Sequence, residues 1–315
     1  MVEPVALCAL VLDSALGWPD WLYRRIGHPV GTFARIIATC ETRWNRPIHA
    51  ACRRRRSGVA TMALLILVSG GTAFAVQHMI RVLAGPWAWI PLAFMAWPAL
   101  AQRSLYDHYI PVAKALGSND LPAARKAVGM IVGRDTAALD RPGVARAAIE
   151  SLAESFCDGV IAPLFWLLVL GLPGIWLYKA VNTADSLIGH PEEPLRDYGW
   201  AAARIDDAAN FIPARLSGIL ICLAGMGSGR NGWRILWRDH GRHASPNAGW
   251  PEAAMAGTLG IRLAGPVRYD GILSEKPWIG DGRKVDFCAV EQARKIYLRA
   301  CLLAWIATGV VASLM

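Results

Sequence analysis

The sequence is poor in charged residues and lacks the motifs that mark several soluble protein classes. Only 18% of its 315 residues are Asp, Glu, Lys or Arg, against roughly 25% in a typical soluble domain. The 7 cysteines are scattered and form no CxxC pair, which argues against a zinc site or a disulfide framework. No Walker-type GxxxxGK[ST] run occurs, and no strand pattern precedes the GxGxxG match at 227–232. That match is therefore not interpreted as a dinucleotide site.

Apolar residues and tryptophan are abundant instead. Hydrophobic residues make up 54% of the chain, and there are 14 tryptophans, which suit a protein with two membrane–water interfaces. The net charge of +9 comes without a nucleic-acid-binding motif, so attraction to anionic lipid headgroups explains it better than a nucleic-acid partner. The composition predicts an all-α integral membrane protein.

Several uncharged or nearly uncharged stretches could cross or enter the bilayer, which needs about 20 apolar residues per helical crossing. We expect about four to six membrane segments joined by long polar helical loops. The expected crossings are 4–18, 58–80, 82–102 and 298–315. Partial insertions are expected at 160–178, which Gly171-Leu172-Pro173-Gly174 interrupts, and at 211–229.

The polar segments suggest one polytopic domain, 1–315, with its basic loops in the cytoplasm. The positive-inside rule places 19–57, 103–159 and 230–299 there, and 19–57 alone carries nine Lys or Arg against two Asp or Glu. Residues 179–215 are less basic, with four Lys or Arg against six acids. If 160–178 turns back inside the membrane, however, 182–210 also faces the cytoplasm.

Three carboxylates recur at every fourth residue: Glu150, Glu154 and Asp158. In a helix they would share one face and repel one another. A magnesium ion would relieve that repulsion, because Mg²⁺ prefers oxygen ligands. The alternative is a solvated acidic face, although the adjoining apolar run at 160 weighs against it.

Further polar clusters follow. The stretch 182–190 contains Asn182, Asp185, Ser186 and His190, and it is either a site or a helix-capping loop. Arg204, Asp206, Asp207 and Asn210 resemble a diphosphate–magnesium site, with a surface ion-pair cluster as the alternative. Ser245, Asn247 and Glu252 surround a helix start that could cradle a phosphate. Arg230, Arg234, Arg238 and Arg242 form a stripe that favours an amphipathic helix on the lipid surface.

Together these stretches resemble the adenosylcobinamide-phosphate synthase family of cobalamin biosynthesis. The similarity covers most of the chain outside 58–102. It is carried by LDSALGWP (12–19), GHPV (27–30), GRDTAALD (133–140), ESLAESFCDGVIAPLFW (150–166), GLPGIWLYKAVNTADSLIGH (171–190), YGWAAARIDDAANFIPARL (198–216) and SPNAGWPEAAMAGTLGIRLAGP (245–266).

The resemblance implies a ligase that forms a C–N bond with ATP and Mg²⁺. Its substrates would be (R)-1-amino-2-propanol or its O-phosphate and the free propionate carboxylate of adenosylcobyric acid. It further implies a multi-pass protein of the inner cell membrane with its active site facing the cytoplasm, and other cobalamin-biosynthesis enzymes as partners.

We assign roles to the polar clusters on chemical grounds. The predicted catalytic residues are Glu154, Asp158, Asp185, His190, Asp206 and Asp207, with His28 as an alternative base to His190. Binding of ATP or phosphate is predicted for Asn182, Ser186, Arg204, Asn210, Ser245, Asn247 and Glu252. The predicted metal ligands are Glu150, Glu154, Asp158 and Asp185.

Two other functions use some of the same residues. A membrane polyprenyltransferase would bind a prenyl diphosphate through Mg²⁺ at its Asp-rich motifs, but such enzymes need more spans. A small transporter or scaffold could use the intramembrane Asp13 and the interrupted segment 160–178. The long polar segments, which hold most of the polar clusters, would then have no role.

Overall fold

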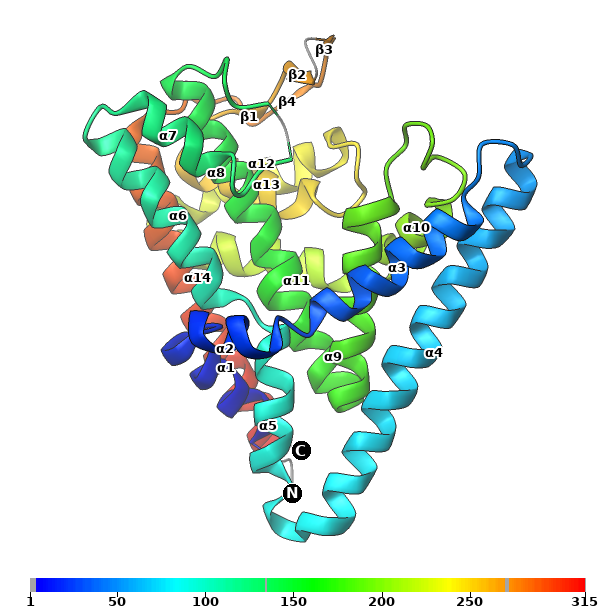
Figure 1. Ribbon diagram of the computed structural model, residues 1–315. Helices are drawn as coiled ribbons and strands as arrows, with labels where there is room; N and C mark the ends of the chain where they lie inside the picture. The colour runs from blue at the N-terminus through cyan, green and yellow to red at the C-terminus, as the bar shows by residue number, and fades with distance from the viewer. Residues whose placement is uncertain (1–3, 134, 270–271, 315) are drawn as a thin grey trace. The chain divides into compact units, whose positions relative to one another are not determined.

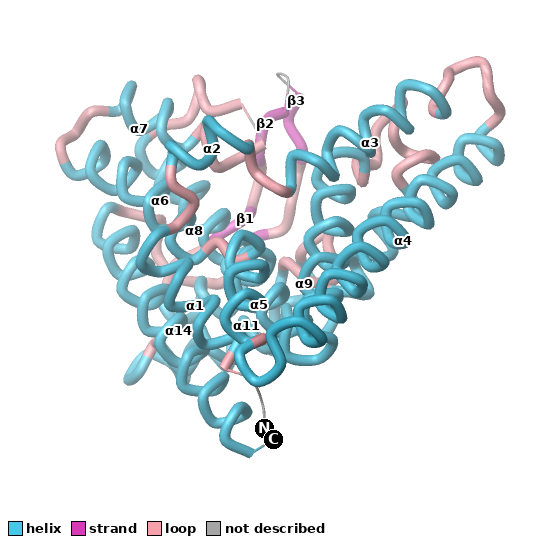
Figure 2. The backbone as a smooth tube through the Cα atoms, turned by 60° about the horizontal axis from the view of Figure 1, so that its bottom comes forward, coloured by secondary structure: helices cyan, strands magenta, loops and turns pink. Residues whose placement is uncertain are grey.

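The computed structural model describes residues 4–133, 135–269 and 272–314, and its chain divides into two compact units. Unit 1 comprises Met1–Ala101, Ala162–Asn210 and Val311–Met315, and unit 2 comprises Gln102–Ile161 and Phe211–Val310. Helices make up most of the described chain (Figures 1 and 2). The predicted all-α class is therefore confirmed.

Unit 1 is built from helices alone in its described part. They are α1 (Val5–Leu16), α2 (Asp20–Ile26), α3 (Val30–Trp44), α4 (Ala51–Ala84), the 3₁₀ turn η1 (Gly85–Trp87), α5 (Trp89–Ala96), the 3₁₀ turn η2 (Trp97–Ala99), α9 (Ala162–Ile188) and α10 (Trp200–Ala209). Its core joins α3, α4, α9 and α10 through residues such as Ile37, Leu65, Ala184 and Ala202. Small residues on α9 and α10 let these helices pack closely.

The long helix α4 buries one narrow stripe and leaves the rest of its apolar surface exposed. Thr61, Met62, Leu65 and Ser69 are buried at helical spacing, whereas Leu67, Phe74 and Leu83 are exposed. A water-soluble helix rarely leaves so many large apolar side chains uncovered. This surface is suited to contact with lipid.

The interruption predicted within 160–178 is present in α9. Gly171 has φ 69° and ψ −150°, a conformation outside the helical region, which glycine adopts without the steric cost of a side chain. The Leu172 N–H that leaves the helical ladder is bonded to Gln77 Oε1 of α4 at 2.9 Å. The freed backbone is thus satisfied by protein, as a helix break in a membrane requires.

Unit 2 contains the remaining helices and two small pairs of strands. The helices are α6 (Gln102–Gly117), α7 (Leu121–Val128), α8 (Arg141–Phe156), the π-helical turn η3 (Cys157–Ile161), α11 (Phe211–Ala224), η4 (Met226–Ser228), α12 (Gly229–Asp239), η5 (His240–Arg242), α13 (Gly249–Leu259) and α14 (Phe287–Leu314). The strands are β1 (Leu263–Ala264), β2 (Val267–Tyr269), β3 (Ile272–Ser274) and β4 (Trp278–Ile279), and they form the antiparallel pairs β1–β4 and β2–β3. In β1–β4, Leu263 pairs with Ile279 and Ala264 with Trp278.

Helix α13 is the buried centre of unit 2, because every one of its residues is buried. Its sequence, GWPEAAMAGTL, is rich in small residues, and α8, α11 and α12 pack against it. A Cβ added to Gly257 would lie 2.7 Å from the Asn231 carbonyl oxygen of α12, so glycine is needed for this close approach.

Among the described residues, three helical stretches are long and apolar enough to cross a membrane: Ala51–Trp87, Arg141–Ile188 and Phe287–Leu314. Two bent pairs, α1 with α2 and α10 with α11, raise the total to five if each pair is one span. The crossing expected at 82–102 is not found as one helix, since α5 has only 8 residues and is about 12 Å long. The 3₁₀ turns η1 and η2 bound it, and each has a proline in its first turn.

Candidate functional site

A cluster of buried and half-buried polar side chains lies between α9 and α10 in unit 1. We define the acid–amide cluster as Tyr178, Asn182, Asp185, Asp206 and Asn210. Asn210 Nδ2 donates to Asp206 Oδ2 at 3.0 Å, and the Tyr178 hydroxyl donates to Asn210 Oδ1 at 3.1 Å. The Asn182 side chain also hydrogen-bonds to Asp206, and the charge of Asp185 acts on it. The cluster brings together two of the segments that the sequence singled out.

Helical spacing explains why these residues meet. Tyr178, Asn182 and Asp185 follow one another at intervals of four and three residues along α9, and therefore share a face. Asp206 and Asn210 are four residues apart at the end of α10. The interpretation of 182–190 as a capping loop is wrong, because residues 182–188 belong to α9 itself.

Asp206 is the central group of the cluster. Its side chain is buried, with the residue only 8% exposed, and its Oδ1 accepts no hydrogen bond from any described residue. A buried carboxylate oxygen without a donor, close to a second carboxylate, is energetically unfavourable. A cation bound between Asp206 and Asp185 would remove both penalties.

The side-chain oxygens of the acid–amide cluster are suitable ligands for a magnesium ion. Mg²⁺ is usually held by one or two carboxylates together with waters and substrate phosphates, and the cluster offers two carboxylates and two amide side chains. Among the described residues, no three His, Cys, Asp or Glu side chains gather closely enough to hold a metal ion. The cluster therefore suits an ion shared with a phosphorylated substrate better than an ion enclosed by protein.

The neighbouring predicted residues lie at the edge of this cluster. Asp207 forms an ion pair with Arg204 at 3.2 Å. The Ser186 hydroxyl donates to the Asn182 carbonyl oxygen at 2.9 Å, and His190 Nε2 is 3.2 Å from the Ser186 carbonyl oxygen. Ser186 and His190 are both exposed.

The alternative base, His28, lies in a less polar environment. Burial lowers its pKa, and the positive charge of Lys179 lowers it further. Lys179 precedes Asn182 by three residues on α9. Because a lowered pKa keeps the imidazole neutral at pH 7, His28 can accept a proton there.

The acids predicted at 150–158 lie in unit 2, whereas Asp185 lies in unit 1. Glu150 Oε1 accepts the Ala264 N–H of β1 at 2.7 Å and is 3.8 Å from Arg146 Nε. Glu154 is exposed on α8, and Asp158 lies in the first turn of the π-helical segment η3. Such turns often occur at functional sites, so Glu154 and Asp158 remain predictions, while Glu150 has a structural contact.

Ser245 organises the turn at the predicted phosphate cradle, 245–252, by local hydrogen bonds. Ser245 Oγ accepts the N–H groups of Asn247 and Ala248, at 3.2 and 3.3 Å. The buried Glu252 lies 3.7 Å from His243 Nε2. Burial and the positive charge of Lys276 lower the pKa of His243. The binding role predicted for Ser245, Asn247 and Glu252 remains a prediction.

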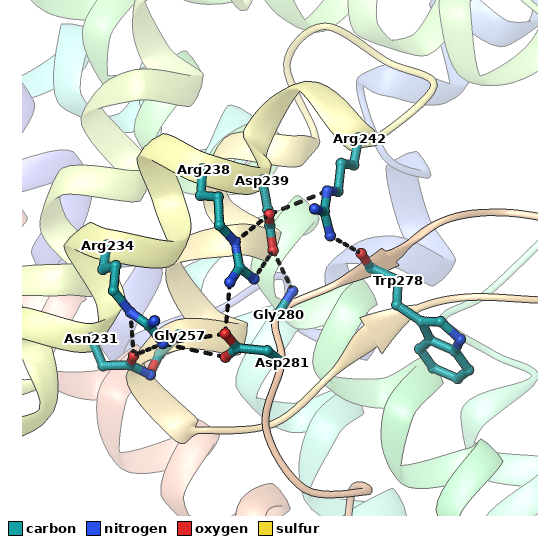
Figure 3. Close-up of polar contacts among 9 residues, drawn as sticks. All are labelled: Asn231, Arg234, Arg238, Asp239, Arg242, Gly257, Trp278, Gly280 and Asp281. Atoms are coloured by element: carbon teal, nitrogen blue, oxygen red, sulfur yellow. Dashed lines mark hydrogen bonds and ion pairs between the residues drawn. The ribbon is translucent and has the colours of Figure 1, made fainter.

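The arginine stripe makes ion pairs that hold a loop of unit 2 (Figure 3). Arg238 Nε and an Nη donate to the two oxygens of Asp239 at 2.8 and 2.7 Å, and Arg242 Nε is 3.2 Å from Asp239. Asp239 Oδ2 also accepts the Gly280 N–H at 2.8 Å. Arg234 and Arg238 both pair with Asp281. We call this network the Asp239 clamp; it fastens residues 278–281 to α12.

Hydrogen bonds keep Asp239 ionised although its side chain is fully buried. Burial alone would raise the pKa of Asp239, but hydrogen bonds from Arg238 and Gly280 hold it below its usual range. The sequence indicated the arginines but gave no reason to pair them with Asp239 and Asp281. The prediction from the arginine spacing therefore did not include these two acidic partners.

We expect Asp239→Asn to destabilise unit 2 by about 2 kcal/mol. Breaking a buried pair costs about 3–5 kcal/mol, and partial exposure of Arg238 (37%) reduces that loss. Thermal melting of the detergent-solubilised protein should show a midpoint several degrees lower. Asp107→Asn is the matched control, because Asp107 pairs with Arg103 at an exposed site of the same unit. Equal melting midpoints for the two variants would contradict a stabilising role for the clamp.

These features define a mainly helical protein with helices long and apolar enough to cross a membrane and a buried, oxygen-rich polar site. The family model described as CobD/Cbib protein matches residues 6–297. The chain therefore belongs to the CobD/Cbib family.

Named relatives agree with the family model. The chain is 47% identical over 310 residues to the Cobalamin biosynthesis protein CobD of Rhodobacter capsulatus, across 97% of this chain and 96% of the relative. It is 44% identical over 314 residues to the protein of that name from Sinorhizobium fredii, across 98% and 96%. No solved structure matches the chain.

Proposed function

We propose that this protein joins (R)-1-amino-2-propanol, or its O-phosphate, to the free propionate carboxylate of adenosylcobyric acid, with hydrolysis of ATP to ADP and phosphate. Membership of a family whose relatives are named for cobalamin biosynthesis supports the pathway. The motifs shared with adenosylcobinamide-phosphate synthases support the reaction. The observation that carries the proposal is the buried Asp206, with its free Oδ1 beside Asp185.

The chemistry requires activation of the carboxylate. A carboxylate does not accept an amine at neutral pH, so its oxygen first attacks the γ-phosphorus of ATP and ADP leaves. The amine then attacks the acyl carbon, phosphate leaves, and the amine proton passes to a base. A bound magnesium ion would neutralise the charge that develops on the phosphoryl group during its transfer.

The acid–amide cluster would hold that ion. Asp185 and Asp206 supply the charge, and the hydrogen bond from Asn210 Nδ2 fixes one Asp206 oxygen while the other stays available. Tyr178 in turn orients Asn210. Such support positions the ligands before substrate arrives, which reduces the reorganisation needed at the moment of reaction.

Two histidines are candidates for the proton acceptor. His28 is partly buried and neutral, whereas His190 is exposed at the end of α9. Buried surroundings favour proton transfer within the site over exchange with water. We therefore place His28 first and His190 second.

The direct test is product formation by the purified full-length protein. Adenosylcobyric acid, MgATP and either amine are supplied. The corrinoid product is identified by mass spectrometry, and the ADP released is quantified. We expect one amide per ADP with at least one of the two amines. A folded protein that releases ADP without amide, or forms neither, would contradict the proposal.

We propose that the active site faces the cytoplasm at the inner membrane, because ATP is supplied there. Impermeant maleimide applied to intact cells should then fail to label single cysteines placed at Ser186 and Pro194, which are both exposed. The same cysteines should react once the membrane is opened. Labelling of intact cells carrying an active variant would place this segment outside and contradict the proposed topology.

A further inference from the structure

A cavity of about 330 Å³ lies in unit 2, and none of its lining residues is one that the sequence indicated for phosphate binding. Arg146, Arg262 and Lys284 line it together with Trp278 and the first turn of α8, which begins after Asp140. A water molecule occupies roughly 30 Å³ in the liquid. The cavity therefore has room for a chain of phosphoryl groups and a few waters.

The three cations come from separate segments of unit 2. Arg146 lies on α8, Arg262 directly precedes β1, and Lys284 lies in the loop between β4 and α14. The Asp239 clamp holds this loop, and Arg242 donates to the Trp278 carbonyl oxygen at 3.1 Å (Figure 3). The clamp therefore holds in place the segment of the cavity wall that contains Trp278.

Trp278 contacts two of the cations through its ring. The guanidinium carbon of Arg262 is 4.7 Å from the Trp278 ring centroid, and that of Arg146 is 5.2 Å away. A cation–π contact stabilises the charge without using any N–H donor. It therefore stabilises two like charges near one another, and an Nη group of Arg146 also donates to the Pro266 carbonyl oxygen at 3.3 Å.

Among the described residues that line the cavity, three are cations and one is an acid. Asp140 is the acid that lines the cavity, and its Oδ1 accepts the Gly143 N–H at 2.8 Å as the cap of α8. Glu150 lies 3.8 Å from Arg146, a distance longer than a strong ion-pair hydrogen bond, and it also accepts the Ala264 N–H. The cavity keeps a net positive charge.

We propose that this cavity binds the phosphoryl groups of a soluble phosphorylated substrate. Two arginines and a lysine converging on one concave surface are the residues that recognise phosphate oxygens. The choice of a substrate as the source rests on the proposed function, which consumes ATP and admits a phosphorylated amine. An anionic lipid headgroup offers the same chemistry, and the test separates the two sources.

The experiment measures binding without turnover. Tripolyphosphate is titrated into the full-length protein in neutral detergent, and heat release gives the affinity for wild type, Arg262→Gln and Lys284→Gln. We expect each variant to bind at least tenfold more weakly. Lys284 is exposed, so its variant should fold even if Arg262→Gln does not. Arg230→Gln is the charge-matched control, since Arg230 is exposed on α12 and does not line the cavity.

A second titration uses short-chain phosphatidylglycerol. Unchanged tripolyphosphate affinity in both cavity variants would overturn the proposal. A loss of phosphatidylglycerol binding with tripolyphosphate binding intact would overturn it in favour of a lipid site. Because these measurements need no amide product, weakened tripolyphosphate binding by the variants would support the cavity even if the proposed reaction failed. Normal product formation with unchanged binding would refute the cavity alone.

Discussion

Asp206→Asn is expected to lower kcat/KM for amide formation at least about a hundredfold, which corresponds to about 2.7 kcal/mol of transition-state stabilisation. The substitution keeps the size of the side chain and removes its charge. Asp206 is buried among Asn182, Asp185 and Asn210, so no other group can take its place. Its loss removes half of the anionic charge available to a magnesium ion.

Two comparison variants make the prediction specific. Asp207→Asn alters the adjacent carboxylate, which is engaged by Arg204 at the edge of the cluster, and we expect a smaller loss than for Asp206→Asn. Glu192→Gln changes an exposed acid of the loop between α9 and α10, and its activity should match wild type. The rates are compared at equal amounts of membrane-inserted protein.

A hundredfold loss could also follow from misfolding, so the melting midpoint of each variant is measured in parallel. Asp206→Asn should melt at or above the wild-type temperature, because it removes the repulsion from Asp185. Near wild-type kinetics for Asp206→Asn would eliminate the acid–amide cluster as the reaction site.

Asp185→Asn is expected to raise the free Mg²⁺ concentration needed for half-maximal rate by at least about tenfold, or about 1.4 kcal/mol. Asp185 is the second carboxylate beside Asp206. Since divalent-ion affinity falls when anionic ligands are lost, the shift should appear in the dependence on free Mg²⁺. The concentration of MgATP is held constant throughout the titration.

Removal of the ion provides the wider test. EDTA in excess should abolish turnover by wild type, and added Mg²⁺ should restore it. Glu192→Gln again serves as the control and should follow the wild-type curve. An Asp185→Asn variant with an unshifted Mg²⁺ curve and a reduced rate would assign Asp185 to another part of the reaction.

Apolar length and glycine–proline chemistry were enough to predict the helical membrane class and the break in α9. The uncharged stretch 160–178 and its Gly171-Leu172-Pro173-Gly174 sequence correspond to a helix with one non-helical residue at Gly171. These are local properties, because lipid compatibility and backbone conformation depend mainly on neighbouring residues. The same reasoning wrongly predicted a single crossing helix over 82–102, where prolines and 3₁₀ turns shorten α5.

The sequence also identified most members of the acid–amide cluster, since Asn182, Asp185, Asp206 and Asn210 stand in two compact polar motifs. Tyr178 was missed, although its spacing of four residues from Asn182 placed it on the same helical face. Which members are buried, and which oxygen lacks a donor, depends on the packing of α9 against α10.

Contacts between distant segments required the tertiary structure. Arg238 and Asp281 are 43 residues apart, and Arg146 meets the Pro266 carbonyl oxygen across 120 residues. A single sequence records charge and periodicity, which determine the helices and their polar faces. It does not specify which loop returns to a given helix, because that choice depends on the joint packing of side chains. The class of the protein, its interrupted helix and its polar motifs therefore follow from the sequence by itself. The Asp239 clamp and the cationic cavity lined by Trp278 depend on the tertiary structure.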